Sequence, residues 1–70
     1  MFYVVIETQV TEGGQVGVIN YGFDSYEDAL AKLYDVLSAA AKSALPYHAG
    51  HILRSDGILT DGRVFDRRGA

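Results

Sequence analysis

The first ten residues, MFYVVIETQV, are mostly apolar, and the two-residue period of a β-strand divides them into two faces. One face of this strand carries no charge and consists of Phe2, Val4, Ile6, Thr8 and Val10. The opposite face consists of Tyr3, Val5, Glu7 and Gln9. The segment Glu12-Gly13-Gly14 favours a tight reversal, after which residues 16–23 form a second apolar stretch. We therefore expect an N-terminal hairpin over residues 2–23.

The pattern then changes to the period of an amphipathic helix. Ser25 can cap the first turn, and Asp28 stands three residues later, where a capping box has its acidic residue. Apolar side chains follow at helical spacing: Leu30, Leu33, Tyr34, Leu37 and Ala41. Pro46 prevents further helix. We expect one helix over residues 25–43, with one side packed on a sheet.

The remaining residues predict a second hairpin over residues 49–66. Its turn is expected at Ser55-Asp56-Gly57, because Asp-Gly between apolar stretches favours a hairpin turn. Asp61-Gly62 is the competing turn; if the first turn is used, Gly62 becomes a bulge or a bend at a sheet edge. The expected fold is a single α+β domain over residues 1–70, with ββαββ order. Its four strands form a mainly antiparallel sheet with one helix across one face.

One helix covers only one face of such a sheet, so the other face is expected to be open. A regular register places five apolar residues there, and we assign them as the candidate interface: Tyr3, Val5, Ile19, Tyr21 and Phe23. A register slipped by one would bring Val16 and Val18 there instead. A 70-residue chain without cysteine has a thin core, worth about 3–5 kcal/mol net. We therefore expect a homo-oligomer, with a dimer as the default.

Composition and charge are those of a folded soluble protein, with 49% hydrophobic residues, 21% charged residues and a net charge of −3. The N-terminal apolar run is too short for a membrane span and lacks the flanks of a signal peptide. The protein is therefore expected to be cytoplasmic, without a membrane partner. Its acidic first half argues against nonspecific nucleic-acid binding as the main function.

Two histidines follow Pro46 in the segment PYHAGH, and they are the most obvious candidates for chemistry. In an extended segment His48 and His51 point to opposite faces, and only Asp56 or Asp61 is conveniently placed to complete a metal site. The favoured interpretation is a connection back to the sheet, with His48 in an exposed loop and His51 opening the strand. An enzyme or metal-binding protein using His48 and His51 is the remote alternative.

Nothing else in the chain has the pattern of a catalytic or cofactor site. No serine or cysteine nucleophile stands beside a base, and Gly13-Gly14 is a turn rather than a nucleotide motif. We assign no catalytic, cofactor-binding or metal-binding residues, and we expect a protein that is not an enzyme.

Four arginines near the C-terminus form the candidate anion or nucleic-acid contacts: Arg54, Arg63, Arg67 and Arg68. Guanidinium groups on one hairpin edge suit phosphate or carboxylate recognition. Three interleaved aspartates favour another interpretation, in which mixed charges protect an exposed edge from pairing. A nucleic-acid or anionic-ligand binder is thus the alternative function, and it predicts binding that weakens steeply with salt.

Four stretches of the chain together resemble a known group of proteins: FYVV at the start, EGG at the first turn, FDSYEDALAKLYDVLS into the helix, and SDG at the second turn. They are similar to small uncharacterised proteins carried by phages and prophages of gut-dwelling bacteria. The resemblance implies the same ββαββ fold and a mobile-element setting, and it brings no catalytic residues. The chain departs from the group at PYHAGH and at its ending FDRRGA.

Taken together, these patterns favour a noncatalytic, homo-oligomeric interaction protein of phage or prophage origin. It would recognise another protein, with a host component as the candidate, through the face or rim of its sheet.

Overall fold

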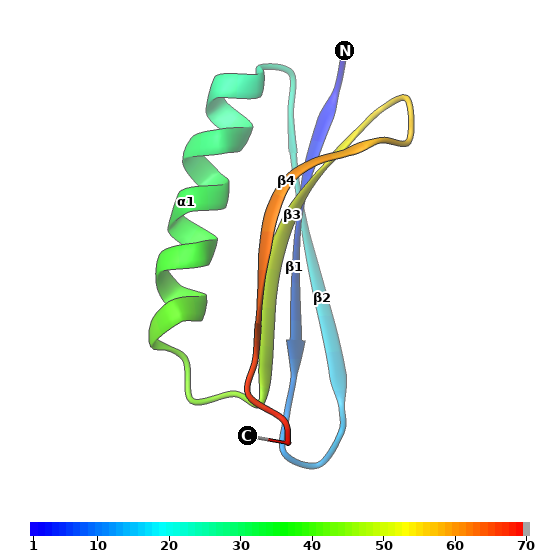
Figure 1. Ribbon diagram of the computed structural model, residues 1–70. Helices are drawn as coiled ribbons and strands as arrows, with labels where there is room; N and C mark the ends of the chain where they lie inside the picture. The colour runs from blue at the N-terminus through cyan, green and yellow to red at the C-terminus, as the bar shows by residue number, and fades with distance from the viewer. Residues whose placement is uncertain (70) are drawn as a thin grey trace.

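The computed structural model describes residues 1–69 and contains four strands and one helix (Figure 1). In chain order these elements are β1 (Tyr3–Val10), β2 (Val16–Phe23), α1 (Tyr26–Lys42), β3 (Tyr47–Arg54) and β4 (Leu59–Asp66). The strands form one antiparallel sheet in the order β2-β1-β3-β4, and α1 packs on one face of it. The α+β, ββαββ prediction is confirmed. Among residues 1–69 there is no helix with the length and apolarity needed to cross a membrane.

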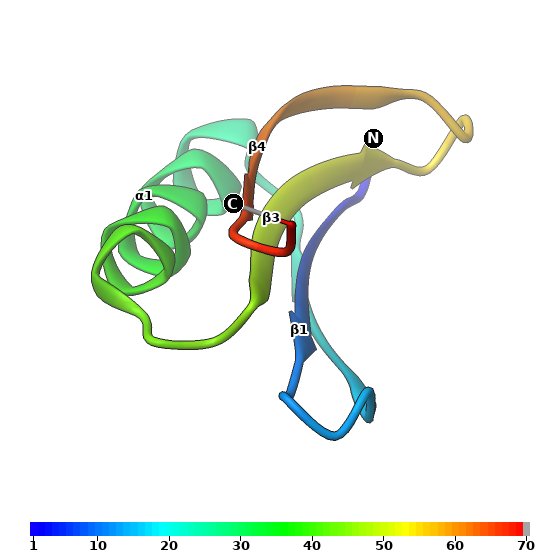
Figure 2. The ribbon, with the colours of Figure 1, turned by 60° about the horizontal axis from the view of Figure 1, so that its bottom comes forward.

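The helix connects two parallel strands that are not neighbours. Strands β2 and β3 are both antiparallel to β1, so they run in the same direction, with β1 between them. Figures 1 and 2 show that α1 makes a right-handed crossover from β2 to β3, which is the hand that nearly all such connections have. Given the strand order, this handedness decides which face of the sheet the helix covers.

The second hairpin turns at the first Asp-Gly pair, as expected. Gly57 has a φ of 89° and its N–H donates to the carbonyl of Arg54 at 2.9 Å. The ladder between β3 and β4 shifts register between His51 and Leu53, where Gly62 lies opposite His51. The expected bulge at Gly62 is therefore confirmed, and the second Asp-Gly is not a turn.

Both ends of the helix have specific caps. The side chain of Ser25 accepts from the backbone N–H of Asp28 at 3.3 Å, as the sequence predicts. At the other end the guanidinium of Arg67 donates to the carbonyls of Ala40 at 2.9 Å and Ala41 at 3.2 Å. Arg67 thus binds two carbonyls of the last helical turn, where Ala40 also accepts from the N–H of Ser43 at 3.2 Å, and it ties the segment after β4 to α1.

The core lies between α1 and the two central strands. Val5 of β1, Ile52 of β3 and Leu33 of α1 are its largest fully buried side chains. Gly50 lies at the centre of the contact, and a Cβ there would be 2.8 Å from Cγ1 of Val36 and 3.1 Å from Cδ1 of Leu33. The helix therefore approaches the sheet closely at a position without a side chain.

The sequence correctly grouped five residues on one face but assigned that face to the wrong environment. The regular register is confirmed, since Tyr3 pairs with Phe23 and Val5 with Tyr21. These residues lie under the helix: Val5 is fully buried, and Tyr3, Tyr21 and Phe23 pack against the core. Ile19 shares their face but is 44% exposed near the sheet edge. The candidate interface of Tyr3, Val5, Ile19, Tyr21 and Phe23 is therefore corrected, because this is the helix-covered face.

The face that α1 leaves uncovered is the opposite one, and we call it the open face. Register places sixteen positions there, in four strands: Val4, Ile6, Thr8 and Val10 of β1; Val16, Val18, Asn20 and Gly22 of β2; Tyr47, Ala49, His51 and Leu53 of β3; Leu59, Gly62, Val64 and Asp66 of β4.

Candidate functional site

A polar cluster lies on the helix-covered face, next to the apolar core. The carboxylate of Glu7 accepts from His48 Nε2 at 2.6 Å, from Gln9 Nε2 at 3.1 Å and from the hydroxyl of Tyr21 at 3.3 Å. These side chains come from β1, β2 and β3, and the register sets them side by side. We call these four residues the Glu7–His48 cluster. It joins three strands through one carboxylate.

The two central members of the cluster are buried, since Glu7 is 7% exposed and His48 is 4% exposed. Burial is the largest single influence on the pKa of Glu7, and it raises that pKa. The hydrogen bonds to the carboxylate and the nearby charge of His48 together outweigh burial, so the pKa of Glu7 lies below its ordinary value of 4.5. Glu7 is therefore held as a carboxylate inside the fold.

The cluster links three strands through hydrogen bonds to one carboxylate. A carboxylate only accepts hydrogen bonds, so His48 must carry a proton on Nε2 and direct it to Glu7. The other ring nitrogen, Nδ1, is buried and has no hydrogen-bond partner among residues 1–69. No nitrogen of His48 is thus exposed to a substrate in this arrangement, and a general base needs an atom within hydrogen-bond reach of the substrate.

The expected role of the PYHAGH segment is corrected by this arrangement. Strand β3 begins at Tyr47 rather than at Ala49, so His48 belongs to a strand and is buried, not part of an exposed loop. The two histidines do point to opposite faces, as expected, because His48 pairs with Gln9 and His51 with Ile6. Within residues 1–69 no cluster of three or more histidine and acidic side chains could hold a metal ion.

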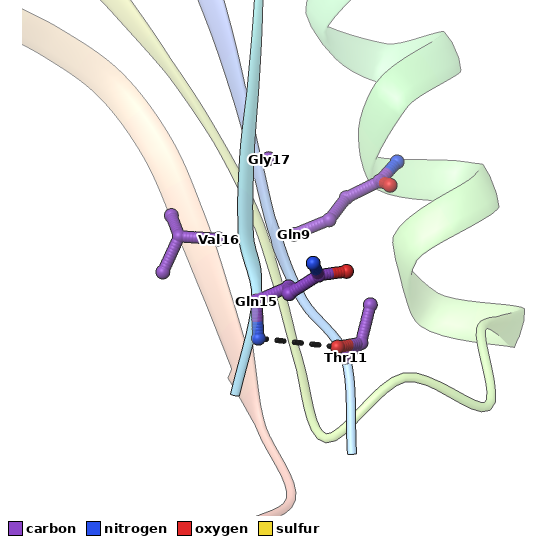
Figure 3. Close-up of a pocket in the computed structure, with 5 residues that line it drawn as sticks. All are labelled: Gln9, Thr11, Gln15, Val16 and Gly17. Atoms are coloured by element: carbon purple, nitrogen blue, oxygen red, sulfur yellow. Dashed lines mark hydrogen bonds between the residues drawn. The ribbon is translucent and has the colours of Figure 1, made fainter. Parts of the chain in front are cut away.

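A shallow hollow of about 380 Å³ lies beside the cluster, at the end of the first hairpin. It is lined by Gln9, Thr11, Gln15, Val16 and Gly17. Figure 3 shows the side chains of Gln9 and Gln15 directed toward the helix side, while Val16 points away from it. The backbone N–H of Gln15 donates to the Thr11 hydroxyl at 3.2 Å. The hollow exists because Gly17, the partner of Gln9, has no side chain to fill it.

The four candidate arginines do not form one site. Arg54 pairs with Asp56 beside the second turn, and Arg68 pairs with Asp66 at the far end of β4. Arg67 caps the helix, and the guanidinium of Arg63 lies 4.9 Å from the ring centre of Phe65. Three of the four guanidinium groups thus have partners within the chain, and Arg54 and Arg68 lie at opposite ends of the second hairpin. The geometry gives no common anion-binding surface on this hairpin.

The open face is apolar, and nearly all of it lacks charge. Exposed apolar side chains on it include Val16 at 66%, Leu59 at 59%, Val18 at 56% and Val64 at 42%. Among the described positions of the open face, only Asp66 and His51 have ionisable side chains. Asp66 is paired with Arg68 at one corner of the sheet. The exposed apolar side chains thus lie on the two edge strands of this face, while the positions on β1 are half-buried and Ala49 of β3 is buried.

On the open face, two aromatic rings cover glycines of the two edge strands, β2 and β4. The ring of Phe2 occupies the space that a side chain at position 22 would need. Its Cζ would lie 2.8 Å from a Cβ added to Gly22. The ring of His51 likewise lies over Gly62, and its Cγ would lie 2.7 Å from a Cβ added to Gly62. An aromatic ring over a strand glycine supplies the packing that the glycine lacks. His51 therefore has a structural reason for its position on this face.

Sequence reasoning missed the Glu7–His48 cluster, because its members lie up to 41 residues apart. The available signal was Glu7 itself, a carboxylate in the same alternating set as Tyr3 and Val5. A charged residue in a buried set requires a partner, and that requirement makes His48 a candidate. No family model, curated protein or solved structure matches the chain.

Proposed function

We propose that this protein is a noncatalytic interaction protein, and that the open face is the surface with which it binds another protein. The observation that carries the proposal is the exposed, apolar and nearly uncharged open face opposite the helix. Exposed apolar patches larger than a few hundred Å² are rare on monomeric proteins and usually mark binding sites.

The size of the face supports this function. Each strand has eight residues, and with strand spacing of about 4.8 Å and a rise of about 3.3 Å per residue the sheet covers roughly 500 Å². Covering it with a partner would bury roughly 1,000 Å² in total, the lower limit of a specific protein interface. The apolar positions would form the centre of such an interface, and the charged turns its rim.

The mobile-element setting that the resemblance implies makes a host protein the proposed partner, and the cytoplasm the proposed compartment. The Glu7–His48 cluster supports a noncatalytic function, because its carboxylate and imidazole are used to hold strands together. The arginines support the nucleic-acid alternative less well, because their partners are intramolecular.

The test compares the open face with the outer side of the helix. Val64→Lys places a charge on the open face, and Tyr34→Lys is the matched control at an apolar residue that is 61% exposed on α1. Immobilised parent and both variants are exposed to host lysate, and each retained protein is purified and its affinity measured. We expect a partner whose affinity falls about tenfold or more with Val64→Lys and is unchanged with Tyr34→Lys. Identical retention by parent and Val64→Lys would refute the proposal.

A further inference from the structure

The two edges of the sheet differ in how they are protected. An edge strand exposes unpaired N–H and C=O groups, and proteins usually block such edges with charges, prolines or bulges. The β4 edge has Asp61, Arg63, Asp66 and the bulge at Gly62. Strand β2 has the sequence VGVINYGF, with no charge and no proline, and its ladder with β1 is regular over its whole length. Only the β4 edge is protected.

The outward-facing backbone groups of β2 can be assigned from the ladder. The N–H of Thr11 donates to Gln15 at 3.0 Å, and the N–H of Ser55 donates to Phe2 at 2.8 Å. Hydrogen-bonded and non-hydrogen-bonded pairs alternate along an antiparallel ladder. The odd-numbered residues of β2 therefore bond to β1, and the free edge presents the backbone groups of Val16, Val18, Asn20 and Gly22.

Strand β2 is also complementary to itself. When two copies pair antiparallel about a two-fold axis at Ile19, both helices lie on the same side of the combined sheet. Gly17 then lies opposite Tyr21 of the second copy, and Gly22 lies opposite Val16 of the second copy. Gly17, whose side-chain position is empty, thus faces a large side chain, and the hollow beside it lies next to an incoming tyrosine. Ile19, which is 44% exposed, meets its own counterpart.

The surroundings leave this edge accessible. Figure 2 shows the β1–β2 hairpin extending away from α1. The exposed apolar residues Val16, Val18 and Ile19 are all on β2, and their exposed fractions run from 44% to 66%. A second copy would bury these side chains and pair the outward N–H and C=O groups in one step.

We propose that β2 pairs antiparallel with β2 of a second copy, with Ile19 at the two-fold axis, to form a dimer with one continuous sheet. This surface is the backbone edge of β2, which borders the open face and shares Val16 and Val18 with it, and the dimer does not depend on the partner proposed for that face. The two open faces become adjacent in the dimer, which doubles the width of the apolar surface.

A single engineered cysteine tests the register, because the chain contains no cysteine. The Ile19→Cys variant places two thiols face to face in a non-hydrogen-bonded pair, where β-carbons are about 4.5–5.5 Å apart. The control is Leu59→Cys, at an apolar residue on the other edge strand that is more exposed, at 59% against 44% for Ile19. Mild oxidation should cross-link Ile19→Cys about tenfold or more faster than Leu59→Cys, because pairing raises the local thiol concentration.

A second pair of variants tests the backbone hydrogen bonds. Asn20→Pro removes an N–H that points to the free edge and takes no part in bonding to β1, so an edge strand tolerates it. Asn20→Ala is the control, because it changes the side chain and keeps the N–H. By sedimentation velocity, Asn20→Pro should weaken the dimer about 30-fold or more and Asn20→Ala should leave it intact. Far-UV circular dichroism checks that both variants fold.

Several results would overturn the proposal. They are a parent that sediments as a monomer, equal cross-linking at Ile19→Cys and Leu59→Cys, and a dimer that is unaffected by Asn20→Pro in a folded variant. A monomer that binds an extended peptide along β2 would assign the edge to a different partner and also refute the dimer. Val64→Lys should remain dimeric, so failure of the open-face proposal is separable from failure of this one.

Discussion

His48 Nε2 lies 2.6 Å from Glu7 Oε2, and this contact joins two central strands through a buried carboxylate and imidazole. The carboxylate also accepts hydrogen bonds from Gln9 and Tyr21, so three side chains donate to it. Removing one member of a hydrogen-bonded buried pair costs more folding free energy than the intact pair contributes. The remaining group is then buried with neither water nor its partner to bond to. Loss of either member of this pair should therefore destabilise the fold by more than the intact pair stabilises it.

Glu7→Ala should destabilise the protein strongly. It leaves the Nε2–H of His48 buried without an acceptor, removes the acceptor of Tyr21 and opens a cavity. The expected loss in the free energy of unfolding is about 3 kcal/mol, which is most of the stability available to a domain of this size. Urea unfolding followed by circular dichroism measures it.

The matched control replaces both members of the pair. In Glu7→Leu/His48→Leu no charged group remains buried without a partner, so the double variant should be clearly more stable than Glu7→Ala. If the double variant is as unstable as Glu7→Ala, the loss comes from altered packing and not from an unpaired polar group.

Acid should weaken the same cluster. The pKa of Glu7 in the folded protein lies below 4.5, so the unfolded chain takes up this proton at a higher pH than the folded chain does. The contribution of Glu7 to stability is therefore complete above about pH 4.5 and is lost as the pH falls through the lower folded pKa. Urea unfolding between neutral and acidic pH should show this loss.

The Glu7→Gln variant is the reference for the acid effect, because glutamine does not titrate. Its stability should fall less steeply with acid than that of the parent. Some slope remains, because hydrogen bonds from Arg68 lower the pKa of Asp66. Equal slopes for parent and Glu7→Gln would contradict the proposed state of Glu7.

Gly50→Ala should displace the helix. The added methyl would lie 2.8 Å from Val36 Cγ1 and 3.1 Å from Leu33 Cδ1, so the core must shift to admit it. We expect a loss of about 1–3 kcal/mol by urea unfolding. Gly13→Ala is the control, since its methyl meets only Thr11 Oγ1 at 3.8 Å, and it should be nearly neutral. Similar losses in the two variants would show that the close helix approach is not the cause.

Arg67→Ala should loosen the C-terminal end of the helix. The guanidinium donates to the carbonyls of Ala40 and Ala41; in the variant both lose this donor, and Ala40 keeps the N–H of Ser43 at 3.2 Å. We expect a loss of about 1–2 kcal/mol and faster amide hydrogen exchange in the last turn of α1. Arg68→Ala is the control, because its ion pair with Asp66 is exposed, and it should change exchange in α1 very little. Equal rates of amide hydrogen exchange in the last turn of α1 in both variants would show that Arg67 does not cap the helix.

The local features of the fold follow from short stretches of the sequence. The cap at Ser25, the end of the helix before Pro46, the turn at Asp56-Gly57 and the bulge at Gly62 were all predictable. Each depends on the conformational preferences of a few adjacent residues. The division of β1 into two alternating sets was predictable for the same reason, because side-chain alternation is a property of a single strand.

Which of those two sets is buried depends on contacts between distant parts of the chain. Both sets contain enough apolar residues to face a helix, so hydrophobicity alone does not choose between Val5 and Val4. The choice follows from the strand order β2-β1-β3-β4, the right-handed crossover and the small size of Gly50, all of which involve residues distant in sequence. Pairing with His48 then allows Glu7 to be buried, because a carboxylate can leave water once its hydrogen bonds are replaced.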